Sequence, residues 1–176
     1  MSKKKPKVLI LDVDGVMTTG QFLYTKNGKI GKVFGPDDHD ALSIIKNFIK
    51  VRFITGDKKG FEISKRRIVK DMNFRLDLVS TVKRIDWIKN KYKLEETIYM
   101  GDGLMDVLVM KKVGYSICPA NGNDLTKKHS DYVTKRSGGD RAVAEACLYI
   151  IKKFFKKKVF SKINLKNKKV SGSWAI

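Results

Sequence analysis

Eight residues near the N-terminus, Leu9-Ile10-Leu11-Asp12-Val13-Asp14-Gly15-Val16, decide which fold and which chemistry the chain can support. The apolar run predicts a buried β-strand, with two acids at its polar end. Because alternate side chains of an extended chain point the same way, Asp12 and Asp14 can converge on one point. Gly15 then permits a sharp turn and the close approach of a ligand. Two converging carboxylates repel each other unless a cation neutralises them, so the pattern predicts a magnesium site with one carboxylate free for chemistry.

The length and composition of the chain limit the classes of protein to which it can belong. With 176 residues, of which 42% are hydrophobic, we expect one globular domain with a substantial core. The apolar runs are shorter than the ~20 residues of a membrane span, and the basic start precedes too few apolar residues for a signal peptide. Cys118 and Cys147 belong to no Cys/His cluster, which indicates reduced thiols rather than a zinc site. We therefore expect a cytoplasmic protein that does not bind membranes.

The formal net charge of +20 is concentrated near the two ends of the chain. Lysines cluster before the first predicted strand, and the segment after Glu145 is rich in lysine and contains no acid. Because no helix-turn-helix, zinc-finger or aromatic RNA-binding motif accompanies these lysines, we expect the charge to attract a small anionic substrate. The alternative is a nucleic-acid-associated protein that uses the Lys-rich ends in a salt-sensitive interaction.

Short apolar runs alternate with helical patterns, which predicts an α/β fold with a Rossmann-like parallel sheet flanked by helices. The Asn27-Gly28 pair predicts a type I′ turn in a β-hairpin at about residues 20–34, directly after the first strand. We expect one domain over residues 1–155, with no cap domain, and a basic tail over residues 156–176. The predicted strands cover residues 8–11, 51–55, 76–79, 97–101, 115–117 and 132–134, and the predicted helices cover residues 40–50, 60–72, 83–92, 104–112 and 140–155.

Four segments bring reactive residue types to the end of a predicted strand or the start of a predicted helix. Because the carboxyl ends of parallel strands face the same crevice, we expect these segments to meet. Phosphoryl transfer uses such a set: a carboxylate attacks phosphorus, a second carboxylate transfers a proton, and a divalent ion, a lysine and a hydroxyl stabilise the phosphoryl charge. The sequence therefore predicts a metal-dependent phosphatase. The four segments are Asp12-Val13-Asp14-Gly15, Thr55-Gly56, Lys83, and Gly101-Asp102 with Asp106.

These motifs resemble those of the haloacid dehalogenase superfamily of phosphatases, over about residues 7–155. The resemblance implies that Asp12 is the nucleophile, which forms an aspartyl-phosphate, and that Asp14 is the general acid and base. It implies that Mg²⁺ is held by the carboxylates of Asp12 and Asp102 and by the main-chain carbonyl of Asp14. Asp106 would support the metal site and Lys83. The phosphoryl-binding residues that the resemblance implies are Thr55, Gly56 and Lys83.

The pattern is also similar to a small capless branch of this superfamily, which acts on phosphates of 2-keto-3-deoxy sugar acids. The shared features are the Asp-Val-Asp-Gly-Val-Met-Thr start, the hairpin after it, residues 34–40, and Tyr132-Val133-Thr134 followed by Gly138-Gly139. The similarity implies hydrolysis of 3-deoxy-D-manno-octulosonate 8-phosphate or a nonulosonate 9-phosphate, in lipopolysaccharide or nonulosonate biosynthesis. It also implies a homotetramer whose hairpins pack at the subunit interface.

Three positions depart from that branch. Asp57 stands where its members usually have Arg, and Gly103 stands where many have Asp or Ser. The arginine of the Gly-Gly-Arg segment is displaced by one position, to Arg141, which we expect to contact substrate or a neighbouring subunit. The changes at Asp57 and Gly103 leave open an alternative, a binding or scaffolding protein of the same fold with little catalysis.

The first predicted helix is preceded by three acids and a histidine. Asp37, Asp38 and Asp40 could contact substrate, but we favour capping of the helix and stabilisation of its dipole. His39 lies between these acids and is expected either to contact substrate or to lie in solvent. Neither choice alters the predicted carboxylate site.

Overall fold

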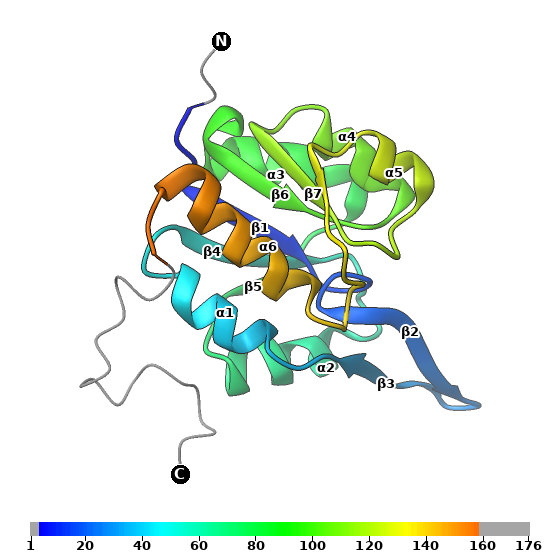
Figure 1. The fold of residues 1–176 in the computed structure, drawn as a ribbon. Coiled ribbons are helices and arrows are strands. Elements are labelled where there is room, and N and C mark those ends of the chain that lie inside the picture. Colours follow the sequence, from blue (N-terminus) through cyan, green and yellow to red (C-terminus); the bar gives the residue numbers. More distant parts are fainter. Residues whose placement is uncertain (1–3, 159–176) are drawn as a thin grey trace.

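The predicted parallel sheet is present in the computed structural model, which describes residues 4–158 (Figure 1). Its six strands run in the order β5-β4-β1-β6-β7-β8, and all neighbouring pairs are parallel. The fold class predicted from the sequence is therefore confirmed. The strands are β1 (Val8–Asp12), β4 (Lys50–Thr55), β5 (Leu76–Leu78), β6 (Thr97–Met100), β7 (Tyr115–Cys118) and β8 (Tyr132–Val133).

The strand order reverses beside β1, which positions the functional site. From β1 the chain moves outward through β4 and β5, and then returns to the other side of β1 to add β6, β7 and β8. Asp12 is paired with Ile54 of β4, and Leu11 is paired with Met100 of β6, so three strands end at the same edge. In open α/β sheets, ligands bind at such a reversal, outside the carboxyl ends of the strands.

Helices cover both faces of the sheet. The side chains of β1 alternate between the two cores: Leu9 and Leu11 pack on the side of α1 and α6, whereas Val8 and Ile10 pack on the side of α3 and α4. This double burial explains why the first strand is a continuous apolar run. The first face carries α1 (Asp38–Ile45), α2 (Phe61–Lys65) with the π-helical turn η1 (Arg66–Asp71), and α6 (Ala142–Ile150) with the π-helical turn η5 (Ile151–Phe155). The second face carries α3 (Arg84–Lys91) after the 3-10 turn η2 (Thr81–Lys83), the turn η3 (Leu94–Glu96), and α4 (Val107–Met110) after the turn η4 (Leu104–Asp106).

The predicted hairpin is formed by β2 (Thr18–Thr25) and β3 (Gly28–Phe34), but its turn differs from the prediction. Thr25 pairs with Gly28, so the turn residues are Lys26 and Asn27. A type I′ turn requires positive φ at both of its central residues, whereas here the positive φ, +115°, is found at Gly28. The type I′ prediction was therefore wrong, because the glycine lies after the turn and not within it. Figure 1 shows the hairpin projecting away from the sheet, beside the end of β1.

Two helix predictions also needed correction. The first helix ends at Ile45 and not near residue 50, because the side-chain amide of Asn47 donates to the carbonyls of Ser43 and Ile44 at the helix end. The helix α5 (Asp124–Lys128) was missed, although Asn123 caps it by accepting a hydrogen bond from the Leu125 N–H.

No helix among residues 4–158 is long and apolar enough to cross a membrane. Of the basic tail predicted over residues 156–176, the part from residue 159 onward lies outside the described residues.

Candidate active site

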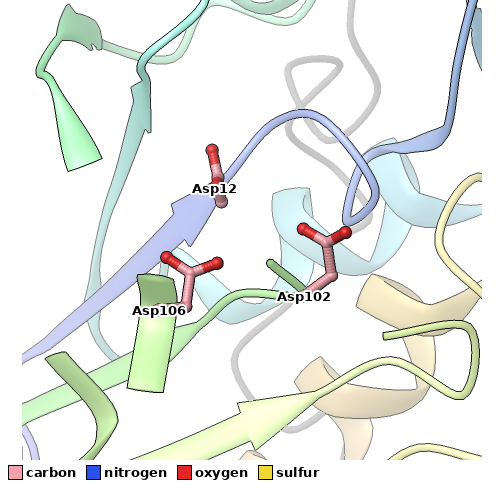
Figure 2. Close-up of side chains that lie close together, drawn as sticks. All are labelled: Asp12, Asp102 and Asp106. Atoms are coloured by element: carbon pink, nitrogen blue, oxygen red, sulfur yellow. The ribbon is translucent and has the colours of Figure 1, made fainter. Parts of the chain in front are cut away.

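Three carboxylates lie together at the edge of the sheet where the strand order reverses. Asp12, Asp102 and Asp106 each place an oxygen within 4.8 Å of the others, and we call them the carboxylate cluster. Figure 2 shows the three side chains close together, Asp12 at the end of β1, Asp102 in the loop after β6 and Asp106 in the short helix that follows. Carboxylate oxygens at this separation are the ligands that Mg²⁺ prefers in proteins. The structure therefore brings three of the predicted metal ligands together.

Two glycines make room for the cluster. Gly15 has a φ of +77°, and a Cβ built there would lie 2.0 Å from the Asp102 carboxylate. A Cβ at Gly101 would lie 2.5 Å from the Asp106 carboxylate. Gly15 therefore serves both the turn after β1 and the close approach of Asp102.

The electrostatics of the cluster favour a bound cation. Burial raises the pKa of Asp12 to about 7, with a further rise from Asp106 and an opposing effect of the nearby guanidinium of Arg84. Burial and the charge of Asp106 likewise raise the pKa of Asp102 to about 7. Acids that resist ionisation in the absence of metal are stabilised as carboxylates by a divalent cation, so the donor set fits Mg²⁺.

The cation beside the cluster is Arg84 and not Lys83. The Arg84 side chain is 2% exposed, and its Nη1 donates to Asp12 Oδ2 at 2.6 Å and to Asp106 Oδ1 at 2.5 Å. Tyr99 completes the group, since its hydroxyl accepts from Arg84 and donates to Asp106. Lys83, at the end of η2, is exposed. The prediction for Lys83 therefore needs correction: the helix begins one residue later, and that residue points inward.

The second carboxylate of the first motif has different partners. The Asp14 carboxylate binds the ammonium of Lys32 at 2.7 Å and accepts from the Thr55 hydroxyl at 3.3 Å. These two partners lie outside the carboxylate cluster. The main-chain carbonyl of Asp14 as a metal ligand stays a prediction.

Asp57, which departs from the branch pattern, is an ion-pair partner of the hairpin. Its Oδ2 contacts Lys29 at 2.5 Å and Lys32 at 2.9 Å, and its Oδ1 accepts from the Gly60 N–H. Although partial burial opposes ionisation, these contacts lower the pKa of Asp57 to about 2. The second departure, Gly103, contributes its N–H, which donates to Asp106 at 2.9 Å.

The remaining predicted residues divide into two groups. Gly56 follows β4 directly, and a Cβ built on it would lie 3.8 Å from the guanidinium of Arg84, so it borders the site. Arg141 is instead bound to Asp37 at 2.6 Å and lines a cavity of about 440 Å³ between α1 and α6. The structure therefore does not join Arg141 to the cluster, because the displaced arginine lies at the start of α6 and faces Asp37.

Of the three acids near the start of α1, Asp37 precedes the helix, whereas Asp38 and Asp40 lie in its first turn. Asp38 accepts from the Ala144 N–H at 2.8 Å and so caps α6 from a neighbouring helix, while burial raises its pKa to about 6. The predicted side-chain cap of the first helix was wrong, because Asp37 at the N-cap of α1 makes no such hydrogen bond and Asp38 caps α6 instead. Asp38 and Asp40 do lie in the first turn of α1, where their charge favours the helix dipole. His39 is buried, and burial lowers its pKa, so of the two alternatives the solvent-exposed one was wrong and contact with substrate stays a prediction.

Sequence reasoning missed three residues of the site: Arg84, Lys32 and Tyr99. Arg84 adjoins the lysine that was chosen, and a one-residue change in the helix start separates them. Tyr99 is part of an apolar strand that the sequence placed in the core. Lys32 belongs to a hairpin with several lysines, and nothing in the sequence marks it as the one that contacts Asp14.

The comparisons with known proteins agree with this geometry. A family model described as haloacid dehalogenase-like hydrolase matches residues 22–147. The curated 3-deoxy-D-manno-octulosonate 8-phosphate phosphatase of Escherichia coli strain K12 is 34% identical over 151 residues, covering 80% of this chain and 77% of that protein. A crystal structure of the same phosphatase from Moraxella catarrhalis, in complex with magnesium, phosphate and KDO, has a TM-score of 0.72 and 28% identity, and covers 85% of this chain and 88% of that one.

A second solved structure gives the same result. The cobalt-bound deoxy-D-mannose-octulosonate 8-phosphate phosphatase of Haemophilus influenzae has a TM-score of 0.74 and 29% identity, covering 89% of this chain and 94% of that one. With the match to the family model and the strand-end carboxylates, these similarities establish that the chain belongs to the haloacid dehalogenase-like hydrolases.

Proposed function

We propose that this protein is a Mg²⁺-dependent phosphomonoesterase that hydrolyses 3-deoxy-D-manno-octulosonate 8-phosphate through an aspartyl-phosphate. The observation that carries the proposal is the carboxylate cluster at the end of β1, with Arg84 bound to Asp12 and Asp106. The activity named for the relatives, at 34% identity over 80% of the chain, supports this substrate. A nonulosonate 9-phosphate is the other substrate that the sequence predicts.

The site residues divide the reaction between them. Asp12 attacks phosphorus and forms the acyl phosphate, while Asp14 protonates the leaving alkoxide and then removes a proton from the attacking water. Lys83 was predicted to bind the phosphoryl group; in this proposal Arg84 is the cation of the site instead, and its guanidinium orients Asp12 and Asp106. Thr55, the last residue of β4, and Gly56, which follows it, would bind the phosphoryl oxygens, as the resemblance implies.

Mg²⁺ fits the same group of residues. The carboxylates of Asp12 and Asp102 would hold the ion, with Asp106 supporting it and the Asp14 carbonyl as a further ligand. When bound, the ion supplies positive charge that offsets the repulsion between the Asp12 carboxylate and the phosphate. Asp12 also has its second oxygen fixed by the Val13 N–H at 2.7 Å, so its orientation does not depend on the ion alone.

Magnesium binding is expected to strengthen as the pH rises through about 7. The pKa values of Asp12 and Asp102 are raised to about 7 in the folded protein without metal, so the folded form binds more protons than the unfolded form between pH ~4 and ~7. The stability of the metal-free protein therefore falls over this range, while Mg²⁺ must displace the same protons. Thermal unfolding at pH 5.5 and pH 8, with Mg²⁺ and with EDTA, should show the larger Mg²⁺-induced rise in Tm at pH 8. An equal rise at both values would contradict the assignment, and Asp102→Asn should remove most of the difference.

The activity test is the release of inorganic phosphate. Purified protein with Mg²⁺ is expected to hydrolyse 3-deoxy-D-manno-octulosonate 8-phosphate in preference to a nonulosonate 9-phosphate and to simple sugar phosphates. Preference for the nonulosonate 9-phosphate would show that this compound, the other predicted substrate, is the one that the protein hydrolyses. No release from any of these compounds, with Mg²⁺ binding intact, would instead support a binding protein that has retained the fold.

A homotetramer is part of the proposal, supported by apolar side chains on the hairpin. Mass measurement in solution should give four copies of the chain, and Ile30→Lys, at the most exposed of these positions, should shift the mass to smaller species. A monomeric wild-type protein would contradict the tetramer. The exposed hydrophobic residues of the hairpin are Phe22 (40% exposed), Leu23 (56%), Tyr24 (59%), Ile30 (60%) and Val33 (48%).

The predicted cytoplasmic location is kept as part of the proposal. It is supported by Cys118 and Cys147, which are free thiols in the structure and are both buried.

A further inference from the structure

Lys32, on β3 of the hairpin, is a fully buried lysine for which the proposed reaction has given no role. Its side chain is 0% exposed, although lysine is almost never fully buried unless it is paired. The ammonium lies 2.7 Å from the Asp14 carboxylate, 2.9 Å from that of Asp57 and 2.8 Å from the Ser64 hydroxyl. An ammonium group has three donors, and three acceptors surround it. The hairpin therefore contributes a buried cation next to Asp14, with two carboxylates and a hydroxyl around it.

These contacts fix the Asp14 carboxylate from two directions. The Lys32 ammonium donates to Asp14 Oδ2 at 3.0 Å and lies 2.7 Å from Oδ1, and the Thr55 hydroxyl donates to Oδ2 from β4. Thr55 is itself fixed, because its hydroxyl accepts from the Asp57 N–H at 3.1 Å. Asp14 is thus linked to two elements of the fold, besides the loop that carries it.

The Asp57 carboxylate stabilises the buried ammonium of Lys32 by pairing with it. Two lysines, Lys29 and Lys32, converge on its carboxylate, and with Asp14 they form a group of two cations and two anions. Burial of a charge is tolerated when the charge is paired and hydrogen-bonded, and here each charge has an opposite partner. Asp57 therefore serves as the counter-ion of the hairpin lysines, which accounts for an acid at this position.

We infer that Lys32 is a positioning residue that holds the Asp14 carboxylate in the orientation needed for proton transfer to the leaving group. The inference rests on the proposed function, in which Asp14 is the general acid. A general acid must lie within about 3 Å of the atom it protonates, so loss of a fixed orientation reduces the rate without removing the acid. Lys32 acts through Asp14 and does not touch the phosphoryl group.

The test compares Lys32→Met with Lys29→Met. Both substitutions remove a buried lysine of the same hairpin that binds Asp57, but only Lys32 contacts Asp14. For an alkyl phosphate such as the sugar acid phosphate, Lys32→Met is expected to lower kcat by roughly 10–100-fold, with KM changed less than about 3-fold. Lys29→Met should stay within about 5-fold of wild type.

A second substrate distinguishes a loss of Asp14 positioning from a general loss of structure in the variant. Nitrophenolate leaves p-nitrophenyl phosphate without needing a proton, so the initial burst of nitrophenolate reports attack by Asp12 alone. The burst rate of Lys32→Met should remain within about 3-fold of wild type. In an Asp14→Asn background, Lys32→Met should cause no further loss, because the residue through which it acts is already removed.

Three results would overturn the inference: an unchanged kcat on the alkyl phosphate, an equal loss in the burst, or an additive loss in the Asp14→Asn background. Should Lys32→Met fail to fold, Lys32→Gln keeps a hydrogen-bonding group and should show the same difference between the two substrates at a smaller size. A wild-type protein that turns over neither substrate would refute the proposed function, and this inference with it. If the wild-type protein turns over both substrates but Lys32→Met affects them equally, only the role of Lys32 is refuted and the proposed function stands.

Discussion

Replacing Asp12 with Asn is expected to lower phosphate release by at least about 10³-fold. An amide differs from the carboxylate by one atom, but it is a poor nucleophile and cannot form the acyl phosphate. In the proposed mechanism the neighbouring carboxylates have other roles, because Asp102 and Asp106 hold or support Mg²⁺ and Asp14, bound to Lys32, is the general acid. Steady-state phosphate release with saturating Mg²⁺ measures the effect.

The intermediate provides a second measurement for this variant. Wild-type protein quenched in acid during turnover should retain covalent phosphate that hydroxylamine releases, since hydroxylamine cleaves acyl phosphates, and Asp12→Asn should retain none. Asp86→Asn is a matched control, because Asp86 is an exposed acid on α3 and the chemical change is the same. Activity of Asp12→Asn near that of the control would exclude the covalent route.

The carboxylate cluster could be predicted from the sequence because the direction of the strands determines where the acids lie. Asp12 follows an apolar strand, Asp102 follows another, and parallel strands end at one edge whatever the distance between them in the chain. The prediction needed only the strand positions and the assumption of a parallel sheet. Small errors in strand ends, such as residue 101 in place of Met100, leave the acids at the same edge.

The positions of the basic residues were harder to predict, because an error of one residue in a helix start or a strand register changes which side chain points into the site. Successive residues of a helix point about 100° apart, so a helix that begins at Arg84 rather than Lys83 turns a different cation inward. In the hairpin, irregular pairing between Leu23 and Tyr24 shifts the register, and alternation alone no longer tells which lysine faces the core. Lys32 and Arg84 were missed for these reasons.

The substitution Arg84→Met should have the second large effect, on both stability and activity. The Arg84 guanidinium is buried against Asp12, Asp106 and Tyr99, and its removal leaves two buried acids without their cation. Breaking a buried pair costs about 3–5 kcal/mol, so the free energy of unfolding in EDTA should fall by an amount of this order. Loss of the group that orients the nucleophile should also lower kcat by roughly 10²–10³-fold.

Two controls, unfolding in the presence of Mg²⁺ and the variant Lys83→Met, test whether the effect is specific to Arg84. A bound divalent ion supplies positive charge to Asp12 and Asp106, so the loss of stability in Arg84→Met should be smaller with Mg²⁺ than with EDTA. Lys83→Met removes the neighbouring, exposed cation and should change the free energy of unfolding by less than about 0.5 kcal/mol and kcat by less than about 2-fold. Chemical denaturation and phosphate release on the two variants decide between the residues. A large loss in Lys83→Met with normal behaviour of Arg84→Met would return the role to the lysine, and would mean that the helix begins at residue 83 in the active protein.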